Sequence, residues 1–171
     1  MRIRGFLPIV LAILVAIFYG IAEISAEKTY ERTIGSFWEL SERASTLDMK
    51  ADYLNRFVAG VDSARLSGND AIIYPTPQNS VEQNITTAKS LQTRMNEIRG
   101  MDVTSFQYQQ AISQVTAQEQ GEAGNMLHVI EGRWFLTYHP LLWGWIQAII
   151  VIGLVVTASF GIGLLMFDNN P

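Results

Sequence analysis

The sequence predicts an all-α membrane protein. Two transmembrane helices are expected to bracket an extracytoplasmic three-helix bundle, up-and-down and coiled-coil-like, with one extended proline-containing linker. Three observations lead to this fold class. Residues 141–167 are apolar without an ionisable side chain, a basic start precedes a second apolar run over 6–22, and apolar residues between them recur at helical spacing. A membrane-spanning helix needs about 20 predominantly apolar residues, so both apolar runs are candidates.

The composition excludes several classes of function. The 171 residues include 12 basic and 16 acidic side chains, and the formal net charge of −4 gives no basic surface for nucleic acid. The absence of cysteine excludes disulfides, thiolate nucleophiles and cysteine-ligated metals. No glycine-rich phosphate loop or serine–histidine–acid pattern occurs in the sequence. We therefore expect a protein that is not an enzyme and that uses neither a cofactor nor a metal.

The N-terminal segment sets the expected orientation in the membrane. Residues 1–5 carry Arg2 and Arg4, which favour the cytoplasmic side. Residues 6–25 are predicted to form the first transmembrane helix, as a signal-anchor. The tripeptide 24–26 ends in a small residue and fits a signal-peptide cleavage site, so cleavage remains an alternative. In either case the middle of the chain is expected outside the cytoplasm.

Residues 26–139 are expected to form the extracytoplasmic domain, which begins with one long helix over 27–66. That stretch contains no proline. Its apolar and small residues recur at heptad spacing: Tyr30, Thr33, Phe37, Leu40, Ala44, Leu47, Ala51, Leu54, Val58 and Val61. One continuous helix of about 40 residues would rise roughly 60 Å. Phe37, Trp38 and Phe57 are expected to pack in the core rather than to form a ligand-binding cluster.

A linker over 67–80 is predicted next, and the turn-forming residues 67–70 are expected to end the long helix. Two prolines favour an extended path, because proline disfavours the helical conformation in the residue before it. With only three helices, this linker must run down the bundle as a fourth, non-helical segment. The short helix that follows would then lie parallel to the long one, with Asp62 and Gly100 close together. The competing arrangement lets the long helix break near Gly35 or Gly60 and fold back, which gives four short helices. Its apolar run is expected to pack against the bundle or, alternatively, to contact a partner: Ile72, Ile73 and Tyr74.

Two further helices complete the predicted domain. Ser80 begins a capping box with Gln83, which predicts a short helix over 81–99. A return helix is predicted over 106–139. Its middle is polar with two glycines and is expected to kink or bulge there. This polar stretch is expected to be a solvated face or, alternatively, a polar pocket or partner surface formed by Gln118, Glu122 and Asn125.

An aromatic collar joins the return helix to the last span. Tryptophan and tyrosine concentrate where a membrane meets water, because their rings are apolar and their edges polar. The collar is therefore predicted to mark the outer membrane interface: Trp134, Tyr138, His139, Trp143 and Trp145. A quinone or haem site is the alternative. Haem is disfavoured, since no second histidine is spaced to ligate with His139.

Residues 140–167 are predicted to form the second transmembrane helix, with 168–171 as a short cytoplasmic tail. Small residues at four-residue spacing, Gly153, Thr157 and Gly161, are predicted to allow close helix packing in lipid. Neither apolar run, 6–22 or 141–167, contains a charged residue. Because ionisable groups inside a membrane usually mark ion or proton routes, their absence argues against a transporter or pump.

This layout resembles the periplasmic helical sensor modules of chemoreceptors and histidine kinases, in architecture and not through a sequence motif. Those receptors continue into a cytoplasmic signalling domain, whereas only 168–171 follow the last span here. We therefore expect a non-enzymatic accessory, scaffold or assembly subunit in the lipid bilayer, acting through helix contacts with a membrane protein partner or with its own copies. The alternatives are a ligand-sensing module that signals laterally to another membrane protein, and an accessory subunit of a membrane redox or transport complex.

Overall fold

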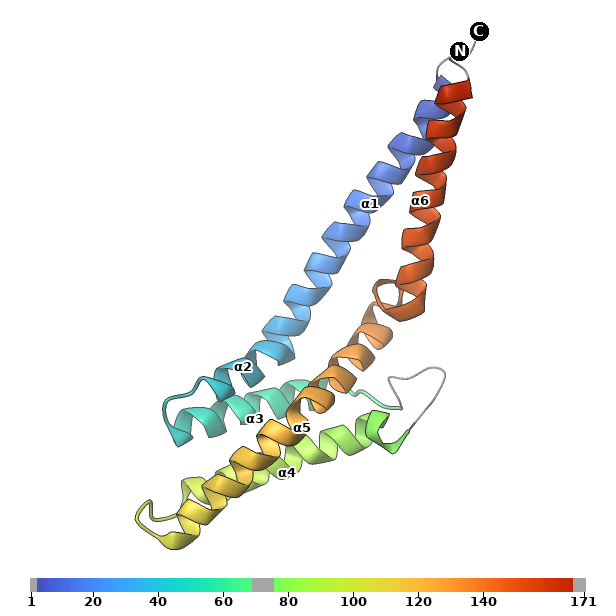
Figure 1. Ribbon diagram of the computed structural model, residues 1–171. Helices are drawn as coiled ribbons and strands as arrows, with labels where there is room; N and C mark the ends of the chain where they lie inside the picture. The colour runs from blue at the N-terminus through green and yellow to red at the C-terminus, as the bar shows by residue number, and fades with distance from the viewer. Residues whose placement is uncertain (1–2, 69–75, 168–171) are drawn as a thin grey trace. The chain divides into compact units, whose positions relative to one another are not determined.

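The computed structural model describes residues 3–68 and 76–167, with side chains over 6–68, 76–116 and 123–166 (Figure 1). All regular elements among these residues are helical, which confirms the all-α class: α1 Ile3–Tyr30, the π-helix η1 Glu31–Gly35, α2 Ser36–Glu42, α3 Leu47–Ser63, the 3-10 helix η2 Pro77–Asn79, α4 Val81–Arg99, α5 Phe106–Tyr138, the 3-10 helix η3 Pro140–Leu142 and α6 Gly144–Phe167. The chain divides into an anchor unit, Met1–Glu27 with His139–Pro171, and a helical unit, Lys28–Tyr138.

The anchor unit contains the apolar part of α1 and the whole of α6. Two helices in the described residues, Phe6–Glu42 and Gly144–Met166, are long and apolar enough to cross a membrane. Most apolar side chains in their apolar stretches are exposed, including those of Phe18 and Phe160. The second of these helices begins at Gly144, a few residues later than expected. Trp143 before it is extended, and Gly144 itself has a φ of +63°, so no helix continues from Pro140 into α6.

The expectation of one long helix over 27–66 is wrong. The chain leaves the helix after Glu42 and begins α3 at Leu47. Thr46 is extended there, and its side chain accepts a hydrogen bond from the Met49 backbone N–H. This N-cap satisfies one of the free N–H groups of the first turn and so stabilises a new helix start.

Helix α3 folds back antiparallel to the segment that precedes it. The rings of Trp38 and Phe57 meet edge to face with centroids 5.3 Å apart. Further along, α3 approaches the π-helix so closely that a Cβ on Gly60 would lie 2.3 Å from the backbone oxygen of Thr33. The heptad stripe therefore belongs to two arms of a hairpin. In the first arm the buried face includes Ile34, Trp38 and Ser41, while Leu40 of the predicted stripe is exposed.

The end of α3 also differs from the prediction. The helix ends at Ser63, before the turn-forming residues 67–70, because Arg65 takes a left-handed φ of +48°. Gly68 has a φ of +88°, and its N–H donates to Oε1 of Glu82 at 2.8 Å. Residues 69–75 lie outside the described residues, and so does most of the predicted extended linker.

Helices α3 and α4 lie antiparallel and are joined by polar side chains along their length. Lys89 Nζ lies 2.8 Å from Oδ1 of Asp62, and Arg99 pairs with both Asp48 and Asp52 at the other end. These pairs place Asp62 away from the Arg99 end. The short helix is thus antiparallel to α3, and the expected proximity of Asp62 and Gly100 is wrong. The described part of the helical unit has the four helices of the competing arrangement, with the break at residues 43–46 and not near Gly35 or Gly60.

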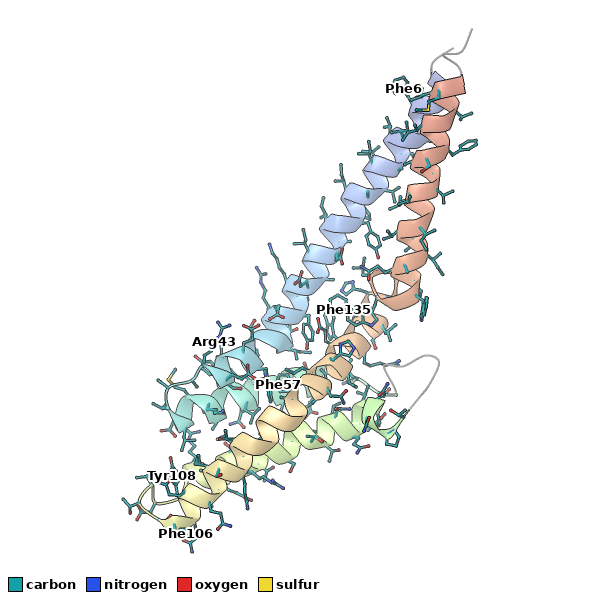
Figure 2. The ribbon with its side chains drawn as sticks, viewed as in Figure 1. Phe6, Arg43, Phe57, Phe106, Tyr108 and Phe135 are labelled. Carbon is teal, nitrogen blue, oxygen red and sulfur yellow. The ribbon has the colours of Figure 1, made fainter. Side chains whose placement is uncertain are left out.

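The two remaining helices have nearly the expected bounds, but the bulge expected in the polar middle of the second is absent, because α5 is one α-helix over its length. Helix α4 spans the predicted residues, with the Ser80 side chain accepting a hydrogen bond from the Gln83 N–H. Helix α5 runs unbroken from Phe106 to Tyr138 and packs along α4. The helices bury a shared core that includes Phe57, Leu54, Met95, Met126 and Ile130. Figure 2 shows Phe57 between helices and Phe106 at the start of α5.

Candidate functional site

The helical unit has two distinct ends. At one end the chain enters at Lys28 and leaves at Tyr138, and Tyr138 donates a hydrogen bond to the Ala64 carbonyl at 2.9 Å. At the other end lie the α2–α3 and α4–α5 turns, which we call the turn end. A surface pocket of about 390 Å³ lies between these two turns, and we call it the turn pocket. Its lining residues are Ser45, Thr46, Leu47, Asp48, Ile98, Arg99, Met101, Val103 and Tyr108.

Arg99 holds one wall of the turn pocket in place. Its Nε donates to Oδ1 of Asp48, and its Nη1 donates to Oδ1 of Asp52 at 3.0 Å. These hydrogen bonds, followed by the attraction of the two carboxylates, raise the pKa of Arg99. Hydrogen bonds from the backbone and side chain of Thr104 lower the pKa of Asp102 at the neighbouring turn. Both turns therefore carry ionised and hydrogen-bonded side chains.

Exposed apolar residues gather at the two turns that hold the turn pocket. Among the described residues of the helical unit, the large apolar side chains that are exposed are those of Tyr138 and of five residues at or next to the two turns: Leu40, Met49, Met101, Val103 and Phe106. We call these five the turn patch. Phe106 is 80 % exposed and Val103 is 60 % exposed. Scattered exposed apolar residues are normal on proteins, so it is their concentration at one end that makes this end a candidate contact surface.

The anchor unit contains a second polar cluster that joins its two long helices. The Tyr19 hydroxyl donates to the Leu141 carbonyl at 2.7 Å. Nε2 of Gln147 donates to Oε1 of Glu23 at 3.1 Å. Gln147 is the one amide of the apolar stretch 141–167, so the structure gives the polar side chain of α6 a partner on α1.

The aromatic collar is divided between the two units. Trp134 is only 5 % exposed. Its ring centroid lies 5.5 Å from that of Tyr30 and 5.2 Å from that of Phe135. It therefore packs within the helical unit. Tyr138 lies 5.4 Å from Trp134, with its ring partly exposed. In the anchor unit, Trp145 is exposed, while the other two collar residues are half-buried: His139 and Trp143.

The three small residues of the last span do not share one environment. Gly161 is buried, whereas a Cβ added at Gly153 would meet nothing within 4 Å. Thr157 donates its hydroxyl to the Gly153 carbonyl at 2.8 Å, within the same helix. Packing of these three residues against a second helix stays a prediction. Gly161 is the one buried residue among the three.

The residues proposed for a polar pocket are only partly described. Asn125 donates to the Gln78 carbonyl at 3.2 Å, which joins α5 to η2. The side chains of Gln118 and Glu122, and all of Ile72, Ile73 and Tyr74, lie outside the described residues.

Sequence reasoning missed the turn pocket and the Glu23–Gln147 pair. The signal for the turn was present: a threonine N-cap candidate at Thr46, followed by Leu47 and then Asp48 in the first turn. The Glu23–Gln147 pair joins residues 124 positions apart, and no local pattern predicts such a contact. Asn84, in an N-glycosylation pattern, is buried and donates to two backbone carbonyls, which makes it a structural residue.

Comparison with known proteins adds no relative. No protein-family model, curated protein or solved structure matches this chain. Among the described residues, no group of three or more histidine or acidic side chains is arranged to hold a metal ion. Function therefore has to be inferred from the geometry of the two units.

Proposed function

We propose that this chain is a two-span membrane protein whose helical unit works outside the cytoplasm through contacts with partner proteins, as an accessory, scaffold or assembly subunit. The observation that supports this most is the contrast in exposure. The anchor unit leaves large apolar side chains such as Phe18 and Phe160 uncovered along two helices of spanning length. Contact of such apolar surfaces with lipid is favourable, whereas their contact with water costs free energy.

The orientation follows from charge at the N-terminus. Arg2 and Arg4 favour a cytoplasmic start, so the helical unit lies outside and the C-terminus returns inside. The first span is proposed to remain as a signal-anchor. Ala26, at the end of the cleavage-site pattern, lies inside α1 and is buried.

A paired labelling experiment tests the orientation. Ser63→Cys and Asn170→Cys each introduce a single thiol, because the natural chain has none. An impermeant thiol reagent added to intact cells is expected to label the first variant and to spare the second until the membrane is opened. Labelling only of the second variant would reverse the topology.

Partner binding is tested by extraction in mild detergent, cross-linking and mass spectrometry. We expect another membrane protein to be recovered at a constant ratio to this chain. Recovery as a lone monomer, at native expression level, would contradict the accessory role.

Ligand sensing is the second candidate, and the turn pocket is the observation that favours it. The pocket combines apolar lining residues with Asp48, Arg99 and Tyr108, so it offers both contact area and hydrogen-bonding groups. A screen of small molecules by thermal shift distinguishes the two roles. A ligand that stabilises the wild type but not Val103→Asp, with no stoichiometric protein partner, would favour the sensor.

A further inference from the structure

The turn patch gathers apolar side chains at the end of the helical unit opposite Lys28 and Tyr138. Met101 and Val103 line the turn pocket, Met49 follows the lining residue Asp48, and Phe106 lies in the sequence between the lining residues Val103 and Tyr108. Figure 2 shows Phe106 close to Tyr108 in the first turn of α5. Two residues of the patch therefore line a pocket of about 390 Å³, which is large enough for an apolar side chain.

The turns that carry this patch are held by local hydrogen bonds. Thr46 caps α3 through the Met49 N–H, and the Ser105 hydroxyl accepts a hydrogen bond from the Tyr108 N–H at 3.1 Å. Asp102 accepts hydrogen bonds from the N–H and the hydroxyl of Thr104. Because both turns are already ordered, binding there costs little conformational entropy.

The charges around the turn pocket have an acidic balance. Asp48, Asp52 and Asp102 provide three carboxylates, and Arg99 provides one guanidinium, which is engaged by the first two. The neighbouring Glu39–Arg43 pair adds one charge of each sign. A partner that brings positive charge around an apolar group is complementary to this arrangement.

We propose that the turn patch docks a basic amphipathic segment of a partner protein, with one apolar side chain inserted into the turn pocket beside Val103 and basic side chains facing the acidic rim. This proposal rests on the proposed function and names the surface that carries it. Phe106 then covers the inserted side chain, as aromatic residues do in the centre of protein interfaces.

Photo-cross-linking in cells tests the proposal on the full chain. Benzoylphenylalanine is placed at Phe106 and, as a control, at Thr93, which is exposed on α4 outside the patch. Mass spectrometry of the product at Phe106 is expected to identify a peptide of another protein that has basic residues flanking an apolar one. A product with lipid, with a second copy of this chain or with an acidic peptide would overturn the proposal, and so would no product.

Substitution separates this proposal from the function on which it rests. In the chain without benzoylphenylalanine, Val103→Ser with Phe106→Ser should reduce recovery of the same partner by mild-detergent extraction and chemical cross-linking at least tenfold, while thermal melting shows that the helical unit stays folded. Raising the salt concentration should also weaken recovery of the wild-type complex, since the rim charges are exposed. If a stoichiometric partner is recovered equally with the wild type and with the double variant, the accessory role stands, but the partner does not dock on the turn patch.

Discussion

Phe57 in the helical unit and Phe160 in the anchor unit illustrate how differently the two units treat the same side chain. Phe57 is 0 % exposed and packs edge to face on Trp38. Phe160 is 65 % exposed on α6. The helical unit behaves as a protein that hides its apolar surface from water, while the anchor unit presents that surface outward. The proposed function accounts for this difference with two surrounding media, water for one unit and lipid for the other.

Truncating these two phenylalanines should give the largest difference between the units in lost unfolding free energy. Phe57→Ala removes a fully buried ring and leaves a cavity, so the helical unit should lose about 3–5 kcal/mol of unfolding free energy. Phe160→Ala should cost much less, because in lipid the lost contacts are replaced by acyl chains. Thermal and denaturant unfolding of the full chain in detergent measures both. Equal losses would mean that α6 is packed against protein and not exposed to lipid.

Glycine substitutions probe close helix approach in the same two units. Gly60→Ala should destabilise the helical unit by about 1–3 kcal/mol, because the new methyl group meets the backbone of Thr33 and not a movable side chain. Gly124→Ala, on α5, and Gly153→Ala, on α6, meet nothing within 4 Å. The first of these controls should stabilise the protein by up to about 1 kcal/mol through helix propensity. A neutral Gly60→Ala would show that α3 and the π-helix are not in contact.

The sequence predicts helices with clear ends much better than it predicts how one helix meets another. Ser80 and Gly100 bracket α4, and the structure follows them. The long helix over 27–66 was expected because a heptad pattern continues across the turn at 43–46. In α3 the residues of this pattern are buried, among them Leu54 and Val58, whereas in the first arm the buried face lies one position further along, at Ile34, Trp38 and Ser41. Capping by Thr46 outweighs the continuous pattern.

The candidate sites were harder to predict, for a related reason. Phe57 and Phe106 are both phenylalanines in helices. Only tertiary packing makes the first buried and the second exposed. Trp134 fits an interface residue by its position near the last span, yet Tyr30 covers it from another part of the chain. Interfaces and pockets depend on such distant partners, which hydrophobic periodicity does not encode.

The polar pair in the anchor unit gives a smaller test of the comparison. A double-mutant cycle of Glu23→Ala and Gln147→Ala should give a coupling free energy of about 0.6 kcal/mol, since hydrogen bonds between membrane helices are usually weak. Unfolding in mixed detergent micelles provides the measurement. Tyr19→Phe removes the separate hydrogen bond to Leu141, and its change in unfolding free energy should add to those of the other two variants without coupling. A coupling of zero would mean that the two helices separate in the membrane.

The smallest expected effect concerns an exposed carboxylate of the helical unit. The N–H of Gly68, more than any other group, lowers the pKa of Glu82 below its ordinary value of 4.5, and the side chain of Ser80 and the charge of Arg133 act in the same direction. A carboxyl whose pKa is lowered by folding stabilises the protein above its unfolded pKa, and this contribution disappears as pH falls through the folded pKa. Glu82→Gln should therefore lower the melting temperature slightly at neutral pH, and the difference from wild type should shrink below pH 4.5. Glu97→Gln removes the same charge from the other end of α4 and controls for net charge. A difference that is constant with pH would show that Glu82 acts through its shape and not through its ionised hydrogen bond to Gly68.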